Sequence, residues 1–184
     1  MDVVPLLRGR FGRPFTFAER CTSTQRLLEG AGEGAVAAAN EQTEGRGRLG
    51  RGWHAPAGTS LLFSIVLVPA MPPERLPELS LVAGRAVADA IADETGLVPA
   101  LKYPNDILLG GRKVAGILAE ASEGRVVLGV GINVSQSQGE LPPGVRATSL
   151  RLAGALNVDR ADLLATVLAQ LEARYDAWIT DAGT

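Results

Sequence analysis

The stretch Ala100–Val134, ALKYPNDILLGGRKVAGILAEASEGRVVLGVGINV, decides the fold predicted for this chain. Its first two apolar runs flank Gly110 and Gly111, and such a two-residue glycine connection is typical of a β-hairpin with a primed turn. A third apolar run, residues 125–134, follows after a short polar break. The pattern therefore predicts a meander of three strands.

Outside this meander, short apolar or alternating runs predict strands, and apolar residues at three- and four-residue spacing predict amphipathic helices. The expected strands span 14–20, 35–42 and 59–68, and the expected helices span 25–29, 76–91 and 159–175. This order favours an α/β (α+β) fold, a mixed β-sheet of about six or seven strands flanked by helices. Residues 1–184 are expected to form a single domain, with 1–13 as an N-terminal extension.

The composition is that of a globular protein and excludes several kinds of site. With 184 residues, 46% of them hydrophobic, the chain can build one core, and its formal net charge of −2 argues against general nucleic-acid binding. Cys21 is the only cysteine and His54 the only histidine, which excludes an internal disulfide and any Cys- or His-based metal cluster within one chain. The longest apolar segment, 60–71, is too short to span a bilayer, so we expect no membrane association and a cytoplasmic location.

The loop QTEGRGRLGRGW (Gln42–Trp53) concentrates positive charge, because it holds three arginines and four glycines. Glycine loses much backbone freedom on ordering and neighbouring guanidinium groups repel, so the segment disfavours its own ordered state. Arginine pairs with phosphate or carboxylate oxygens, and glycine lets backbone N–H groups approach them, so an anionic ligand would order the loop. By itself the pattern also fits a solvated basic surface loop or a flexible contact to nucleic acid.

Polar residues of the meander are expected to converge at one end of the sheet. KYPND (102–106) lies in the first strand of the hairpin and Lys113 begins the second, so the hairpin brings them side by side. Gly116 interrupts an apolar run, where the usual reason for a glycine is the close approach of a ligand or another backbone. Asn133 lies at the end of the third run. Taken singly, a turn residue, a lysine reaching water or a satisfied loop amide would explain each of them.

Four motifs occur in an order that resembles a known enzyme family. They are GRGRLGRGW (45–53), KYPND (102–106), KVAGIL (113–118) and GVGINV (129–134). The residues Ser23-Thr24-Gln25 stand where the family has a Ser-Thr pair usually followed by Asn, and Gln42 stands where it has a glutamine before the loop. From Thr22 to its last helix the chain thus resembles the biotin protein ligases, which activate biotin with ATP and attach it to a lysine of a carboxylase carrier domain.

The resemblance implies a sheet-and-helix fold related to the class II aminoacyl-tRNA synthetase core. It implies ATP, Mg²⁺ and biotin as ligands and the biotin carboxyl carrier protein of acetyl-CoA carboxylase or a related carboxylase as partner. A homodimer through the sheet, as in other members, is compatible with it. Joining the biotin carboxylate to the α-phosphate of ATP brings two anions together, and fixed guanidinium groups and Mg²⁺ can offset their charge.

The resemblance also implies three overlapping groups of site residues. The catalytic residues would be Lys113, Arg48 and Arg46. The biotin-binding residues would be Ser23, Thr24, Gln25, Gln42, Gly45, Arg46, Arg48, Lys113, Gly116 and Ile117. The nucleotide-binding residues would be Arg48, Arg51, Trp53, Lys102, Asn105, Asp106 and Asn133, with Asp106 also as a Mg²⁺ ligand.

The chain departs from the family pattern in several places. Tyr103 replaces the usual tryptophan and keeps an aromatic wall, whereas Glu44 places a carboxylate beside the loop arginines. The 21 residues before Thr22 are too few for the helix-turn-helix domain of some members, so we expect no nucleic-acid binding. We also expect no C-terminal β-barrel of the kind that assists ATP and carrier binding in many members.

Three other functions are compatible with parts of the sequence. A non-catalytic biotin-binding module would keep Ser23, Thr24 and Gln42 without turning over ATP. A lipoate or octanoyl transferase would share the fold but would need a larger apolar channel. An Arg/Gly nucleic-acid binder would need base-stacking aromatic residues beside the loop, where only Trp53 stands.

Overall fold

A single seven-stranded sheet organises the structure, a computed structural model that describes residues 1–181. The strand order is β1-β2-β3-β7-β6-β5-β4, and all neighbouring strands are antiparallel except β1 and β2. The strands are β1 (Phe15–Cys21), β2 (Val36–Gln42), β3 (Ser60–Leu67), β4 (Ala100–Lys102), β5 (Asp106–Leu109), β6 (Arg112–Ser122) and β7 (Arg125–Asn133). The expected mixed sheet is therefore confirmed.

The predicted three-strand meander forms one half of this sheet with four strands, because a turn at residues 103–105 divides the run expected as one strand into β4 and β5, which pair with each other. Gly110 and Gly111 connect β5 to β6 with φ angles of 54° and 72°, the left-handed values that a primed hairpin turn requires. Strand β6 then pairs along its length with β7, and Gly116 lies directly opposite Gly131. Two glycines side by side leave a shallow place on the sheet that no Cβ fills.

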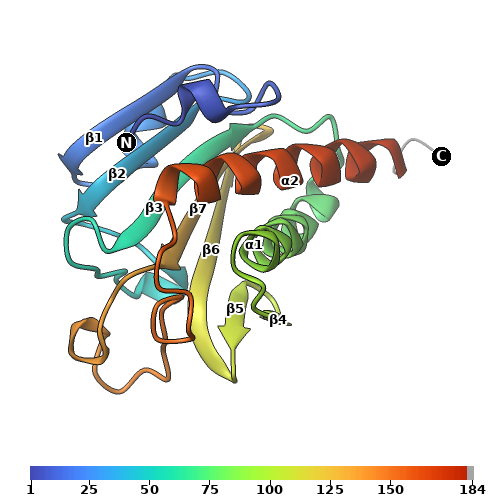
Figure 1. The fold of residues 1–184 in the computed structure, drawn as a ribbon. Helices are drawn as coiled ribbons and strands as arrows, with labels where there is room; N and C mark the ends of the chain where they lie inside the picture. Colours follow the sequence, from blue (N-terminus) through green and yellow to red (C-terminus); the bar gives the residue numbers. More distant parts are fainter. Residues whose placement is uncertain (182–184) are drawn as a thin grey trace.

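Two long helices, α1 (Leu79–Thr95) and α2 (Arg160–Asp181), pack against each other and cover one face of the sheet (Figure 1). Helix α1 ends at Gly96, which adopts the left-handed conformation common at helix ends. It begins later than predicted, because residues 73–78 form a 3₁₀ turn that contains Pro77. Among residues 1–181, no helix combines the length and apolar character needed to cross a membrane.

The helix predicted at 25–29 was wrong in type, since the structure has only a single 3₁₀ turn, Arg26–Leu28. Thr24, which precedes this turn, has its polar side chain engaged elsewhere. Thr24 bonds to Gln42 at the end of β2 and to Ser64 in β3, and no side chain caps the turn. Long-range hydrogen bonds thus replace the local ones that favour a helix start.

The alternation of β3 assigns its side chains to two different environments. Leu61, Phe63 and Ile65 belong to the core beneath the helices. Leu62 and Ser64 point to the opposite face, because successive side chains of a strand alternate. That face carries the candidate site. Because β3 is thus covered on both faces, all eight of its residues are buried.

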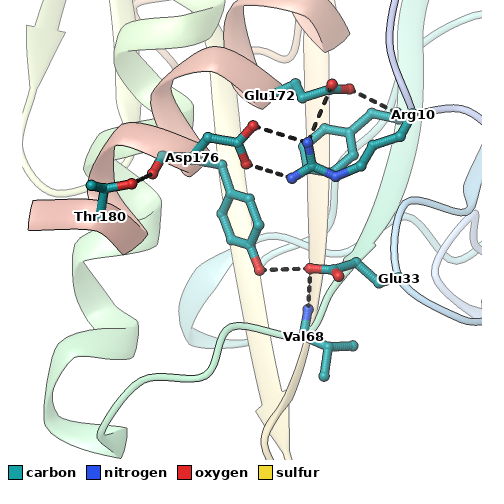
Figure 2. Close-up of polar contacts among 8 residues, drawn as sticks. Arg10, Glu33, Val68, Glu172, Asp176 and Thr180 are labelled. Atoms are coloured by element: carbon teal, nitrogen blue, oxygen red, sulfur yellow. Dashed lines mark hydrogen bonds and ion pairs between the residues drawn. The ribbon is translucent and has the colours of Figure 1, made fainter. Parts of the chain in front are cut away.

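The N-terminal extension is part of the core. Val3, Leu7 and Phe11 are buried in the same cluster as the two helices. Figure 2 shows the polar contacts that join this segment to α2, in which the Arg10 guanidinium bonds the Asp176 carboxylate and forms an ion pair with a second acid of the helix. The extension therefore packs as an integral part of the domain.

Figure 2 also shows a buried phenol beside that contact. The Tyr175 hydroxyl donates a hydrogen bond to Glu33 Oε1 at 2.8 Å, and Glu33 also accepts one from the Val68 backbone. Burial first, and then the Glu33 carboxylate, raise the pKa of Tyr175 well above its usual value. Its hydroxyl therefore stays protonated and ties α2 to the loop before β2.

Candidate functional site

The sheet face opposite the helices carries a pocket with about 490 Å³ of empty space, part of it open to solvent. Its walls come from the turn before the 3₁₀ segment, from the Arg/Gly loop and from β3, β6 and β7. The pocket brings together eleven of the residues predicted from the sequence: Ser23, Thr24, Gln25, Gln42, Arg46, Arg48, Trp53, Asn105, Lys113, Gly116 and Ile117. Segments that lie far apart in the sequence thus line one pocket.

One wall is built of buried, uncharged polar side chains. Gln42 Oε1 accepts hydrogen bonds from the Thr24 backbone N–H (2.7 Å) and hydroxyl (3.1 Å), and the Thr24 hydroxyl also contacts Ser64 Oγ at 2.7 Å. Gln25 is nine-tenths buried, yet its Nε2 has no hydrogen-bond partner in the part of the chain that the structure describes. A buried donor left free is costly unless a ligand satisfies it.

The loop arginines Arg46 and Arg48 also line the pocket, and the protein itself holds them. Arg46 Nη2 donates to Gln25 Oε1 and to Glu120 Oε2, both at 2.9 Å, and Arg48 Nη1 donates to Asn105 Oδ1 at 3.2 Å. These contacts provide a source of order that sequence reasoning missed, because Glu120 looks like an ordinary exposed residue near a strand end. An anionic ligand would have to compete with these groups for the arginines.

Glu44, expected beside the loop arginines, instead forms an ion pair with Arg26 at 3.3 Å. Arg26 belongs to the 3₁₀ turn, and neither residue of this ion pair is part of the pocket lining. Tyr103 is largely exposed, so its hydroxyl reaches solvent. Neither departure from the family pattern alters the walls of the pocket.

Among the three cations of the pocket lining, Lys113 is the one that a strand, β6, carries. Its Nζ lies 2.7 Å from Asp106 Oδ1 and 5.6 Å from the centre of the Trp53 ring. Both charged side chains are about one quarter exposed, so the pair lies at the edge of the pocket rather than in the core. A lysine held by one carboxylate can exchange that partner for a phosphate or carboxylate oxygen of a ligand.

The two facing glycines explain where Trp53 lies. A Cβ at Gly131 would be 2.6 Å from Trp53 Cε2, and one at Gly116 would be 3.1 Å from Trp53 Cζ3. The indole therefore lies flat across β6 and β7 where side chains are absent. Gly131 and Gly129 line the pocket with Gly116 but were not predicted as site residues, although their spacing places them on the same face.

Five predicted site residues lie outside the pocket lining: Gly45, Arg51, Lys102, Asp106 and Asn133. Gly45 closes the base of the loop, since its carbonyl accepts from the Trp53 N–H at 2.8 Å. Arg51 and Lys102 are exposed. Asn133 is buried with its amide used internally, donating to the Thr148 carbonyl and accepting from Gln136 Nε2. Asn133 is therefore a satisfied internal amide in this structure rather than a free ligand-binding group.

No cluster of three or more His, Cys, Asp or Glu side chains that could hold a metal occurs within residues 1–181. Asp106 is a single carboxylate next to the pocket. Mg²⁺ is commonly bound by one or two carboxylates together with water and substrate phosphates, so one carboxylate fits an ion that arrives with a nucleotide.

Comparison with protein families matches residues 17–137 to the biotin/lipoate A/B protein ligase family. The chain is 36% identical over 185 residues to the bifunctional ligase/repressor BirA of Bacillus subtilis, covering 94% of this chain and 57% of that protein. It is 45% identical over 150 residues to the biotin–acetyl-CoA-carboxylase ligase of Mycobacterium tuberculosis, covering 79% of this chain and 56% of that protein. The chain thus spans little more than half the length of these relatives.

A solved structure has the same architecture. Biotin protein ligase from Aquifex aeolicus, in complex with biotin and ATP, superposes with a TM-score of 0.83 at 34% sequence identity, covering 91% of this chain and 72% of that one.

Proposed function

The chain belongs to the biotin/lipoate A/B protein ligase family, and on this premise we propose that it activates biotin with ATP and transfers the biotinyl group to a lysine of a carrier protein. The observation that carries the proposal is the composition of one pocket. Buried amide and hydroxyl groups line one wall, and cations from the loop and β6 line another. Biotin needs both, because it joins a polar cyclic urea to a carboxylate.

In the first step, a biotin carboxylate oxygen attacks the α-phosphorus of ATP, the α–β phosphoanhydride bond breaks and pyrophosphate leaves. Arg46, Arg48 and Lys113 offset the negative charge that gathers as the two anions meet. For this, each of them exchanges its internal partner for a ligand oxygen. Mg²⁺ bound at Asp106 would neutralise phosphate charge during this step.

In the second step, the lysine amine of the carrier attacks the acyl carbon, AMP leaves with the bridging oxygen, and the amine loses its proton. The Arg/Gly loop covers the pocket beside Trp53 and limits water access to the activated acid. The acceptor that we propose is a biotin carboxyl carrier protein, in keeping with the activity named for the Mycobacterium tuberculosis relative. Catalysis thus relies on charge compensation and positioning by this chain's own residues.

Pyrophosphate release from the purified chain with ATP, Mg²⁺ and biotin tests the first step. We expect biotin-dependent release, and a loss of about 100-fold or more in Lys113→Ala, the scale seen when one charge-stabilising donor is removed. Arg85→Ala is the matched control, because Arg85 is an exposed cation on α1 away from the pocket. This control should release pyrophosphate at the wild-type rate.

The alternatives give different results in the same assay. Release with lipoate in place of biotin would assign the pocket to the other branch of the family. Biotin binding without any release would indicate a binding module and contradict the proposed ligation.

A further inference from the structure

Ser64 is an unusual residue for its position. It lies in the middle of β3, it is fully buried, and its neighbours on that strand are apolar. A hydroxyl in such a place costs free energy unless it is hydrogen-bonded. Its side chain lines the pocket and contacts Thr24 at 2.7 Å, so its polar group serves the site rather than the core.

The direction of each hydrogen bond around Ser64 follows from which atoms can donate. A backbone N–H only donates, so the Gln42 atom that faces the Thr24 N–H has to be the amide oxygen. That oxygen only accepts, so the Thr24 hydroxyl gives it its single proton. The Ser64 hydroxyl must then donate to Thr24 Oγ1, because Thr24 has no second proton to offer.

These hydrogen-bond directions determine which donors and acceptors remain free at the polar wall of the pocket. Gln42 is held by its oxygen, so its Nε2 protons remain available, and none is used within residues 1–181. Gln25 Nε2 is the second available donor. Ser64 Oγ has given up its proton and keeps only acceptor capacity. A cyclic urea, with one carbonyl and two N–H groups, complements donors and an acceptor, whereas a dithiolane ring satisfies neither.

We propose that Ser64 is a positioning residue that holds the Thr24 hydroxyl in its hydrogen bond to Gln42 and thereby makes the pocket selective for a cyclic urea. The inference rests on the proposed function and names a determinant of its substrate class. Without the Ser64 proton, Thr24 can turn its hydroxyl away from Gln42, whose oxygen the Thr24 backbone N–H still holds. The Thr24 hydroxyl would then present a mixture of orientations to the ligand.

Calorimetric titration of Ser64→Ala with biotin and with desthiobiotin tests the inference. Desthiobiotin keeps the cyclic urea but lacks the sulfur-containing ring. We expect both dissociation constants to rise by the same factor, about five- to tenfold, which corresponds to the loss of one buried hydrogen bond. The KM for ATP should stay unchanged, because the nucleotide does not contact the urea.

Ser60→Ala is the matched control, since Ser60 is also a fully buried serine on β3 but lies outside the pocket lining. It should bind biotin as the wild type does. Ser64→Cys, which keeps the size and a weaker donor, should bind with intermediate affinity and serves if the alanine variant does not fold.

Unchanged biotin affinity in Ser64→Ala and Ser64→Cys would overturn the role of Ser64 while leaving biotin as the substrate. A larger loss for biotin than for desthiobiotin would also overturn it, because the effect would then lie at the sulfur ring. A wild-type chain that binds neither ligand would instead overturn the proposed function.

Discussion

Replacing Gly131 by alanine perturbs the point where the Arg/Gly loop meets the sheet. The added Cβ would be 2.6 Å from Trp53 Cε2 and 2.7 Å from Cζ2, well inside the separation of about 3.5–4.0 Å that carbon atoms prefer. Gly131 lies near the end of β7 but between two paired strands, so its backbone cannot move away easily. The indole therefore has to shift, and the loop that carries it shifts too.

The magnitude follows from the cost of one extra carbon in a packed site. Such overpacking destabilises proteins by about 1–3 kcal/mol. For a chain of this length, each kcal/mol corresponds to about 2–4 °C in Tm, so the variant should melt about 2–12 °C below the wild type. Trp53 is one of only two tryptophans, so its displacement should also change the fluorescence emission.

Thermal unfolding and fluorescence of the same samples provide the measurement, with Gly32→Ala as control. A Cβ at Gly32 meets no atom within 4 Å and its φ lies outside the left-handed region, so that variant should be as stable as the wild type or slightly more stable. Wild-type Tm and emission in Gly131→Ala would refute the reasoning, because the indole could not then lie over this glycine.

Two further outcomes follow from contacts in the structure. Glu120→Gln removes the negative charge that competes with a ligand for Arg46. The free energy of unfolding should fall by less than about 1 kcal/mol, and biotin should bind up to about fivefold more tightly. Weaker biotin binding in calorimetric titration would contradict this competition. Tyr175 has a folded-state pKa above its usual value of 10.0, so its stabilisation is present below that pH and is lost as the pH rises further. Urea unfolding at about pH 9 and about pH 11 should therefore show a larger loss in the wild type than in Tyr175→Phe, and equal losses would count against this assignment.

Local patterns were enough to predict the sheet. The paired glycines at 110–111 and the alternation of the strands act over a few residues, so their outcome does not depend on distant contacts. Most of the pocket lining was predicted by the resemblance of the motifs to a known family, and only the polar residues of the meander were predicted to converge because a hairpin brings strand ends together. Lys113 and Asn105 do line one pocket with Thr24.

The remaining features were decided only by the tertiary structure. Glu120 is 74 residues from Arg46, and Ser64 is 40 residues from Thr24, and no local pattern indicates which partner either side chain takes. Asn133, predicted as a nucleotide-binding residue, instead uses its amide in internal hydrogen bonds to Thr148 and Gln136. The sequence by itself determined which residues face the same side of the sheet, because that depends on strand periodicity. Which partner each polar group takes was settled by long-range packing, since a hydrogen bond forms only where the fold brings two atoms within about 3 Å.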